Sequence, residues 1–188
     1  HIASMNTQSG PPPQLAAPGA GLPKIERFVA NLMIRWKAAR STRTQAAATF
    51  ESERAAILSL LQGRGEAALV RPVLITRLPG LEDSSRYWSL LMVVDHLRIV
   101  NRNIAGVIAM LGEGRKSERE ASIAAVKPSP QVTEAVIAEF DQGCNDFAKT
   151  VAEIPDLKTA LKFSHPWFGP MDATAWHFMT GFHMQLHH

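Results

Sequence analysis

The sequence has little of what marks secreted, membrane-spanning or nucleic-acid-binding proteins. Its 188 residues contain one cysteine, Cys144, which excludes an internal disulfide and suits a reducing, cytoplasmic compartment. No apolar run reaches about 18 residues without a charge, so we expect neither a membrane-spanning helix nor a membrane partner. The net charge of +3 is mild, and no nucleic-acid-binding motif accompanies the basic residues, so no nucleic-acid partner is expected.

The sequence also lacks strand-like alternation of apolar and polar residues, and it contains no internal repeat. Hydrophobic residues make up 46% and charged residues 20% of the chain, which is the composition of an ordinary globular protein. Residues 1–23 are interpreted as the remnant of an expression tag (HIASM) followed by a flexible arm rich in proline, glycine and alanine. Residues 24–188 are predicted to form a single domain.

Helical periodicity accounts for most of that domain. Apolar stripes predict helical segments over residues 24–39 and 43–61, as one bent helix or two, and then helices from Ser84 or Ser85 to Leu111, from Ser129-Pro130 to Ile154, and from Ala173 onward, after the N-cap Asp172. Between them, VRPVLITRL is compatible with a short helix or with extended chain. Four long amphipathic helices favour an all-α four-helix bundle, with residues 24–39 as an extra segment packed outside it.

The C-terminal segment concentrates the chemistry, because five of the seven histidines lie between His165 and His188. His183 and His187 stand four residues apart in a predicted helix, so their imidazoles share one face and can bind one metal ion. His177 and His188 point away from that face. Met184 stands where H-E-x-x-H has its glutamate, which argues against a zinc protease of that kind. The alternative is a pair of ordinary core-edge or surface histidines.

A metal site needs a third ligand, and His96 is the candidate. It lies on a predicted inward stripe that also contains Met92, Val100 and Asn103. A lone histidine on such a stripe is commonly a hydrogen-bonded core residue, so both interpretations stay open. Cys144 lies within the apolar stripe of the helix that follows, which favours an inert, packed thiol over a nucleophile.

Together these residues resemble the DinB-like superfamily of bacterial four-helix bundles, which includes metal-dependent thiol transferases. The resemblance rests on VDHL around His96, on HPWFG at residues 165–169, and on Trp176 followed by GFHMQLHH. It implies an up-down-down-up bundle in which His96, His183 and His187 bind one divalent metal at one end. Zinc or nickel is favoured, with iron and manganese as alternatives, since all four accept imidazole.

The resemblance further implies a metal-dependent transferase or hydrolase that acts on a small-molecule thiol or electrophile. Four residues are candidates for the wall of its pocket: His165, Trp176, Asn103 and Thr180. A turn-stabilising role is the alternative for His165, and plain core packing for Trp176. No nucleophile with an adjacent base is recognisable in the sequence, so catalysis without the metal is not expected.

Two more expectations concern association and the competing function. Relatives often pair, and the apolar and aromatic side chains of residues 24–39, among them Phe28, Leu32, Met33 and Trp36, also suggest a homodimer. The alternative is that this segment folds back on its own bundle. The competing function is a non-catalytic, stress-related bundle protein in which the metal joins two helices.

Overall fold

The computed structural model describes residues 13–118 and 120–188. These ranges form six α-helices: α1 (Lys24–Arg40), α2 (Arg43–Leu61), α3 (Glu66–Val70), α4 (Leu90–Gly112), α5 (Ala135–Glu153) and α6 (Ala173–His187). Short strands pair antiparallel in twos, β1 (Val73–Leu74) with β2 (Tyr87–Trp88) and β3 (Phe163–His165) with β4 (Gly169–Met171). The tag remnant and the start of the predicted arm lie outside the described residues.

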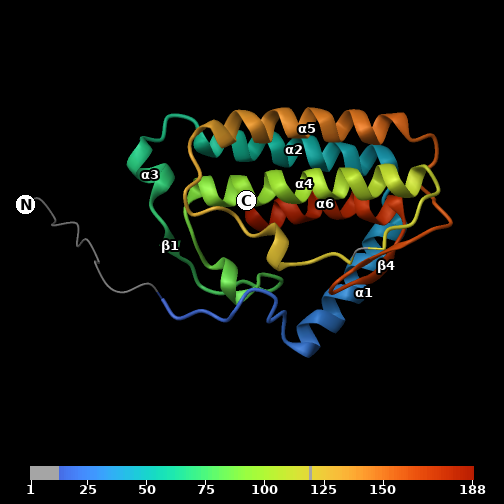
Figure 1. The fold of residues 1–188 in the computed structure, drawn as a ribbon, viewed down its shortest axis with the longest axis horizontal. Coiled ribbons are helices and arrows are strands. Elements are labelled where there is room, and N and C mark those ends of the chain that lie inside the picture. The colour runs from blue at the N-terminus through green and yellow to red at the C-terminus, as the bar shows by residue number, and fades with distance from the viewer. Residues whose placement is uncertain (1–12, 119) are drawn as a thin grey trace, which may run out of the picture.

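The long helices α2, α4, α5 and α6 form the predicted bundle (Figure 1). Along the long axis of Figure 1, α2 and α6 run in one direction and α4 and α5 in the other, so the up-down-down-up order is confirmed. Phe50 of α2 stacks on Phe147 of α5 in the core, with ring centroids 4.5 Å apart. Because α4 and α6 are antiparallel neighbours, the beginning of α4 lies beside the end of α6.

Local capping explains where two of the helices begin. The Thr42 hydroxyl accepts from the Gln45 N–H at 3.2 Å, and the Gln45 side chain accepts from the Thr42 N–H at 2.9 Å. This reciprocal capping box starts a new helix, so residues 24–61 form two helices rather than one bent helix. Asp172 caps α6 as predicted, since its carboxylate accepts from the Ala175 N–H at 2.9 Å.

Two predicted helix starts are wrong, because other local structure takes up the residues before each helix. The α4 helix begins at Leu90 after the N-cap Ser89, since a 3₁₀ turn (Asp83–Ser85) and the pairing of β1 with β2 take up residues 83–88. VRPVLITRL begins with Val70, the last residue of α3, and continues through β1 without further helix. The α5 helix begins at Ala135, because the Ser129 N–H donates to the buried Asp95 carboxylate at 2.9 Å and this segment stays non-helical.

The α1 helix packs outside the bundle against α6, as predicted for residues 24–39 (Figure 1). Much of its apolar stripe faces solvent: Ile25 is 81% exposed, Phe28 71% and Leu32 64%. The homodimer suggested by these side chains stays a prediction. The described part of the predicted arm contacts the domain, because the N–H groups of Gly19 and Gly21 donate to the Glu82 carboxylate at 2.8 and 3.1 Å.

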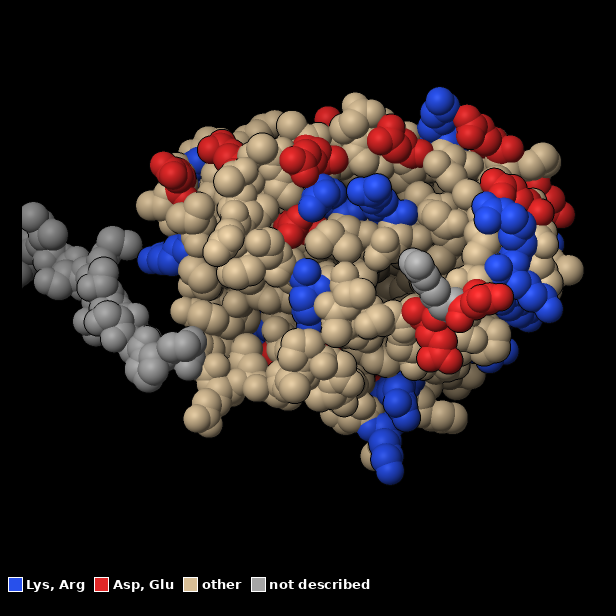
Figure 2. All heavy atoms as spheres, viewed as in Figure 1, with Lys and Arg blue, Asp and Glu red and all other residues tan. Residues whose placement is uncertain are grey.

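The surface charges and the apolar character of the helices bear on nucleic-acid and membrane partners. On the face shown in Figure 2, basic and acidic side chains are interspersed rather than gathered into one patch of a single sign. In the part of the chain that the structure describes, no helix combines the length and the apolar character needed to cross a membrane.

The contact between α2 and α6 depends on Gly181. A Cβ atom added there lies 3.1 Å from the Phe50 backbone nitrogen and 3.2 Å from the Thr49 methyl group. Because a backbone nitrogen cannot move without its helix, we expect Gly181→Leu to lower the free energy of unfolding by about 1–3 kcal/mol, measured by urea denaturation. The matched control is Gly143→Leu in α5, where an added Cβ meets nothing within 4 Å. Equal stability of the two variants would contradict the close approach.

Candidate metal centre

Three histidine side chains converge at one end of the bundle. His96, His183 and His187 each have one ring nitrogen in the group, and these three nitrogens lie within 4.8 Å of one another. The Nε2 atoms of His96 and His183 are 3.2 Å apart. Two nitrogens bound to a tetrahedral ion at about 2.0–2.1 Å stand about 3.3 Å apart, so this spacing suits a shared ion. The group could therefore hold a metal.

The antiparallel packing of α4 and α6 brings these histidines together. His96 lies in the second turn of α4, and His183 and His187 lie on one face in the last turns of α6. Trp88 covers the group from β2, with its ring 5.0 Å from that of His96 and stacked at 6.0 Å on that of His187. No sequence pattern identifies Trp88, because it lies in β2, just before α4 and outside any helical period.

A backbone carbonyl fixes the orientation of His96. Its Nδ1 is 2.6 Å from the Val126 oxygen, so Nδ1 carries the proton and donates it. The lone pair of Nε2 then points into the histidine group, which is the arrangement of a metal-ligating imidazole and its outer partner. The Nδ1 of His183 is buried without a hydrogen-bond partner among the described residues. No sequence pattern identifies Val126, because the contact uses its main chain.

The electrostatics keep the imidazoles neutral. Burial lowers the pKa of His96 to about 4, and the charge of Lys127 acts in the same direction. Burial, followed by the nearby His96 and Lys127, lowers the pKa of His187 to about 3. The pKa of His183 is lowered too, chiefly by burial. At neutral pH all three therefore offer lone pairs rather than charges.

A cavity of about 990 Å³ adjoins the histidine group. Its walls come from α1, α4, α6, the β3–β4 turn, residues 79–85, Ser117 and residues 120–127, and all three histidines take part in them. Figure 2 shows a recess in this side of the molecule. Because all three histidines line the cavity, an ion held by the group would be accessible from it.

Of the four candidates for the pocket wall, the structure places Asn103, His165 and Trp176 along this cavity. The Nδ1 of His165 also accepts the Trp167 N–H at 3.1 Å, in the turn between β3 and β4. His165 therefore both lines the cavity and stabilises the turn. Trp176 is likewise packed in the core, and its Nε1–H donates to the Phe163 carbonyl at 3.2 Å. Thr180 is not in the wall; it is fully buried, and its hydroxyl donates to the Trp176 carbonyl at 3.0 Å.

The remaining reactive side chains considered above lie away from the histidine group. His177 is 2% exposed and packs against Phe147, with ring centroids 6.0 Å apart. The Nδ1 of His188 is 2.9 Å from the Glu53 carboxylate. Burial raises the pKa of the Cys144 thiol to about 12, so this cysteine stays protonated and unreactive at neutral pH.

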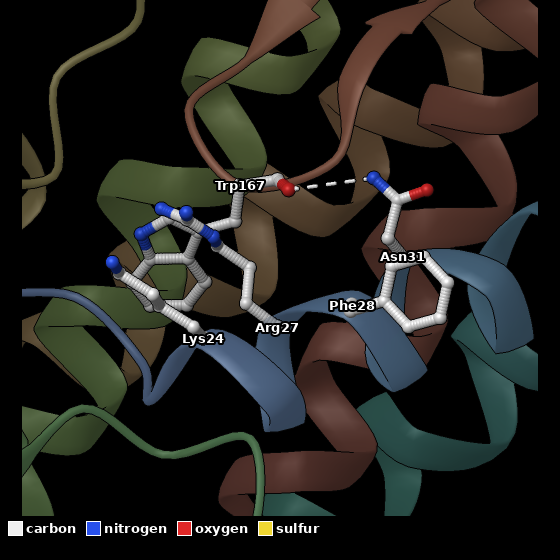
Figure 3. Close-up of a pocket in the computed structure, with 5 residues that line it drawn as sticks. All are labelled: Lys24, Arg27, Phe28, Asn31 and Trp167. Atoms are coloured by element: carbon white, nitrogen blue, oxygen red, sulfur yellow. Dashed lines mark hydrogen bonds between the residues drawn. The ribbon is translucent and has the colours of Figure 1, made fainter.

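A smaller pocket of about 410 Å³ lies where the β3–β4 turn meets α1. Figure 3 shows Lys24 and Arg27 of α1 beside the Trp167 ring, with the Asn31 amide donating to the Trp167 carbonyl at 3.4 Å. The turn therefore rests directly on α1. This contact matters for the cavity, because Trp167 and Phe168 of the turn form part of its wall.

Comparison with known proteins supports the fold. No family model matches the chain, and no curated protein matches it either. Among solved structures it is similar to TT2238, described as a four-helix bundle protein, with a TM-score of 0.57 and 25% sequence identity over 78% of this chain and 94% of that one. Fold and site together define a four-helix-bundle protein with a three-histidine group that could hold a metal ion.

Proposed function

We propose that this protein is a metal-dependent enzyme of the DinB-like kind, a thiol transferase or a hydrolase, in which His96, His183 and His187 hold one divalent ion. The observation that carries the proposal is the convergence of three neutral imidazoles beside a large cavity. Three protein ligands with an open side are typical of catalytic rather than structural sites. A zinc or nickel ion bound there would supply a Lewis acid able to activate a thiol or a water molecule.

The residues around the group support this proposal. The Val126 carbonyl orients the His96 ring, and Trp88 covers both His96 and His187. Lys127 pairs with the Glu82 carboxylate at 2.7 Å, which fixes its ammonium group close to the site. The cavity would admit a substrate to the side of the histidines left open.

The experiment that tests the proposal is a turnover assay on the chain beginning at Met5, which removes the extra imidazole of His1. Protein loaded with Zn²⁺ or Ni²⁺ is assayed for transfer of small thiols to electrophiles and for ester and amide hydrolysis. We expect turnover that requires the metal, disappears in His96→Ala and persists in the control His188→Ala. If the metal binds and raises the melting temperature while no turnover depends on His96, the metal joins two helices and the enzymatic proposal is wrong.

A further inference from the structure

The cavity is elongated, and the histidine group lies at one end of it. Its wall includes one face of α4, from His96 through Val100, Asn103 and Val107 to Met110. At 1.5 Å per residue this face extends about 21 Å. The α6 helix runs antiparallel beside it, from Trp176 at the far end to His187 at the histidine end.

Away from the histidines the wall is mostly apolar. It is formed by aliphatic, aromatic and methionine side chains from several elements, including Ile104, Met110, Phe163, Met179 and Phe182. Two acidic groups of the wall are neutralised: Glu26 pairs with Arg77 and Glu82 with Lys127, each at 2.7 Å.

Two other charged residues of the wall, Arg102 and Glu120, are exposed at its rim. The cavity therefore offers a long apolar interior with charge confined to neutralised pairs and to the rim. A small polar thiol would fill only a fraction of about 990 Å³ and would leave most of this apolar surface against water.

We propose that the cavity binds a long, flexible apolar chain, with the functional group of that molecule placed next to His96, His183 and His187. The substrate class is thus a long-chain aliphatic compound. The role of the functional group of this compound rests on the proposed function. The binding of its alkyl chain does not require a metal. Val29 and Met33 of α1 both line the cavity and remain exposed, so we expect the ligand to enter beside α1.

The first test measures binding of uncharged primary alcohols, from four to fourteen carbons, to the metal-free protein by displacement of Nile red. Each added methylene is expected to tighten binding roughly fourfold, from about 0.8 kcal/mol per buried CH₂, until the chain fills the cavity. Affinity that does not change with chain length would overturn the proposal.

Two variants test whether the alkyl chain of the alcohol binds inside the cavity or on the exposed apolar stripe of α1. Gly106 lies in the cavity wall, and a Cβ added there meets nothing within 4 Å, so Gly106→Phe extends into open space. Val107→Phe narrows the same region from the next position. We expect both variants to bind the longest alcohols at least about tenfold more weakly and the shortest ones normally. Gly143→Phe on α5 is the matched control and should behave as the parent protein. Unchanged binding of long alcohols by both cavity variants would contradict the assignment.

A third variant separates this inference from the enzymatic proposal. In the metal-free assay His96→Ala should keep the dependence on chain length, because the apolar wall is unaffected. If chain length governs binding but no metal-dependent turnover is found, the inference stands and the enzymatic proposal fails. If turnover depends on His96 but binding does not depend on chain length, the enzymatic proposal stands and the inference is wrong.

Discussion

Alanine at His96, His183 or His187 is expected to lower the affinity for Zn²⁺ by at least about 100-fold. Loss of an outer partner of a metal ligand typically costs 10–100-fold, and loss of one ligand in three costs more. The three nitrogens lie within 4.8 Å of one another, so each replacement leaves only two. Competition with a chromophoric chelator at pH 7 measures the change, using the chain that begins at Met5.

His188→Ala is the matched control for these variants. It removes a histidine from the same end of α6, but one whose Nδ1 contacts Glu53 at 2.9 Å instead of the group. Its affinity should equal that of the parent. If His96→Ala binds Zn²⁺ as tightly as the parent protein does, then α4 contributes no ligand. The site would then reduce to the pair on α6.

The stability of the metal-free protein is expected to fall steeply between pH 7 and pH 5, in part through His177. Burial, with a smaller contribution from Arg43, lowers the pKa of His177 to about 4, against 6.5 for an unperturbed histidine. Between these values the unfolded chain binds a proton that the folded chain excludes, so stability decreases as the pH falls. This one group should cost about 2 kcal/mol at pH 5 and almost nothing at pH 7.

His177→Met tests this expectation, because methionine has a similar size, adapts its shape and does not titrate. Urea unfolding at pH 7 and pH 5 should show the variant losing about 2 kcal/mol less than the parent on acidification. His188→Met serves as control, since it removes an exposed histidine next to the same helix. Identical losses for His177→Met and the parent would show that the buried imidazole does not drive the acid sensitivity.

The sequence predicted the bundle and two of the three histidines of the group for simple physical reasons. Helical periodicity gave the long helices, and the four-residue spacing placed His183 and His187 on one face. Spacing could not show that His96 meets them, because this depends on which helices are antiparallel neighbours. That pairing was implied by the resemblance to DinB-like proteins.

The inward stripe assigned to α4 shows a second limit. His96 is buried as predicted, but most of the stripe predicted with it lines the cavity. The other buried side chains of this helix are Leu91, Val94, Asp95, Leu97, Asn101, Ile104, Ile108 and Leu111. An apolar face against a cavity has the same period as one against a core, so periodicity cannot distinguish them. Trp88 and the Val126 carbonyl were missed because neither belongs to a long helix.

The position of α1 gives the cavity one wall that carries no member of the histidine group. All three histidines come from α4 and α6, whereas α1 supplies Val29, Ala30, Met33 and Ile34 to the cavity wall and no ligand to the group. Under the proposed function, this wall can change during evolution, and with it the molecules that fit the cavity, without any change to the histidines. A protein engineer could exchange the sequence of residues 24–40 to alter which molecules enter, while leaving the histidine constellation intact.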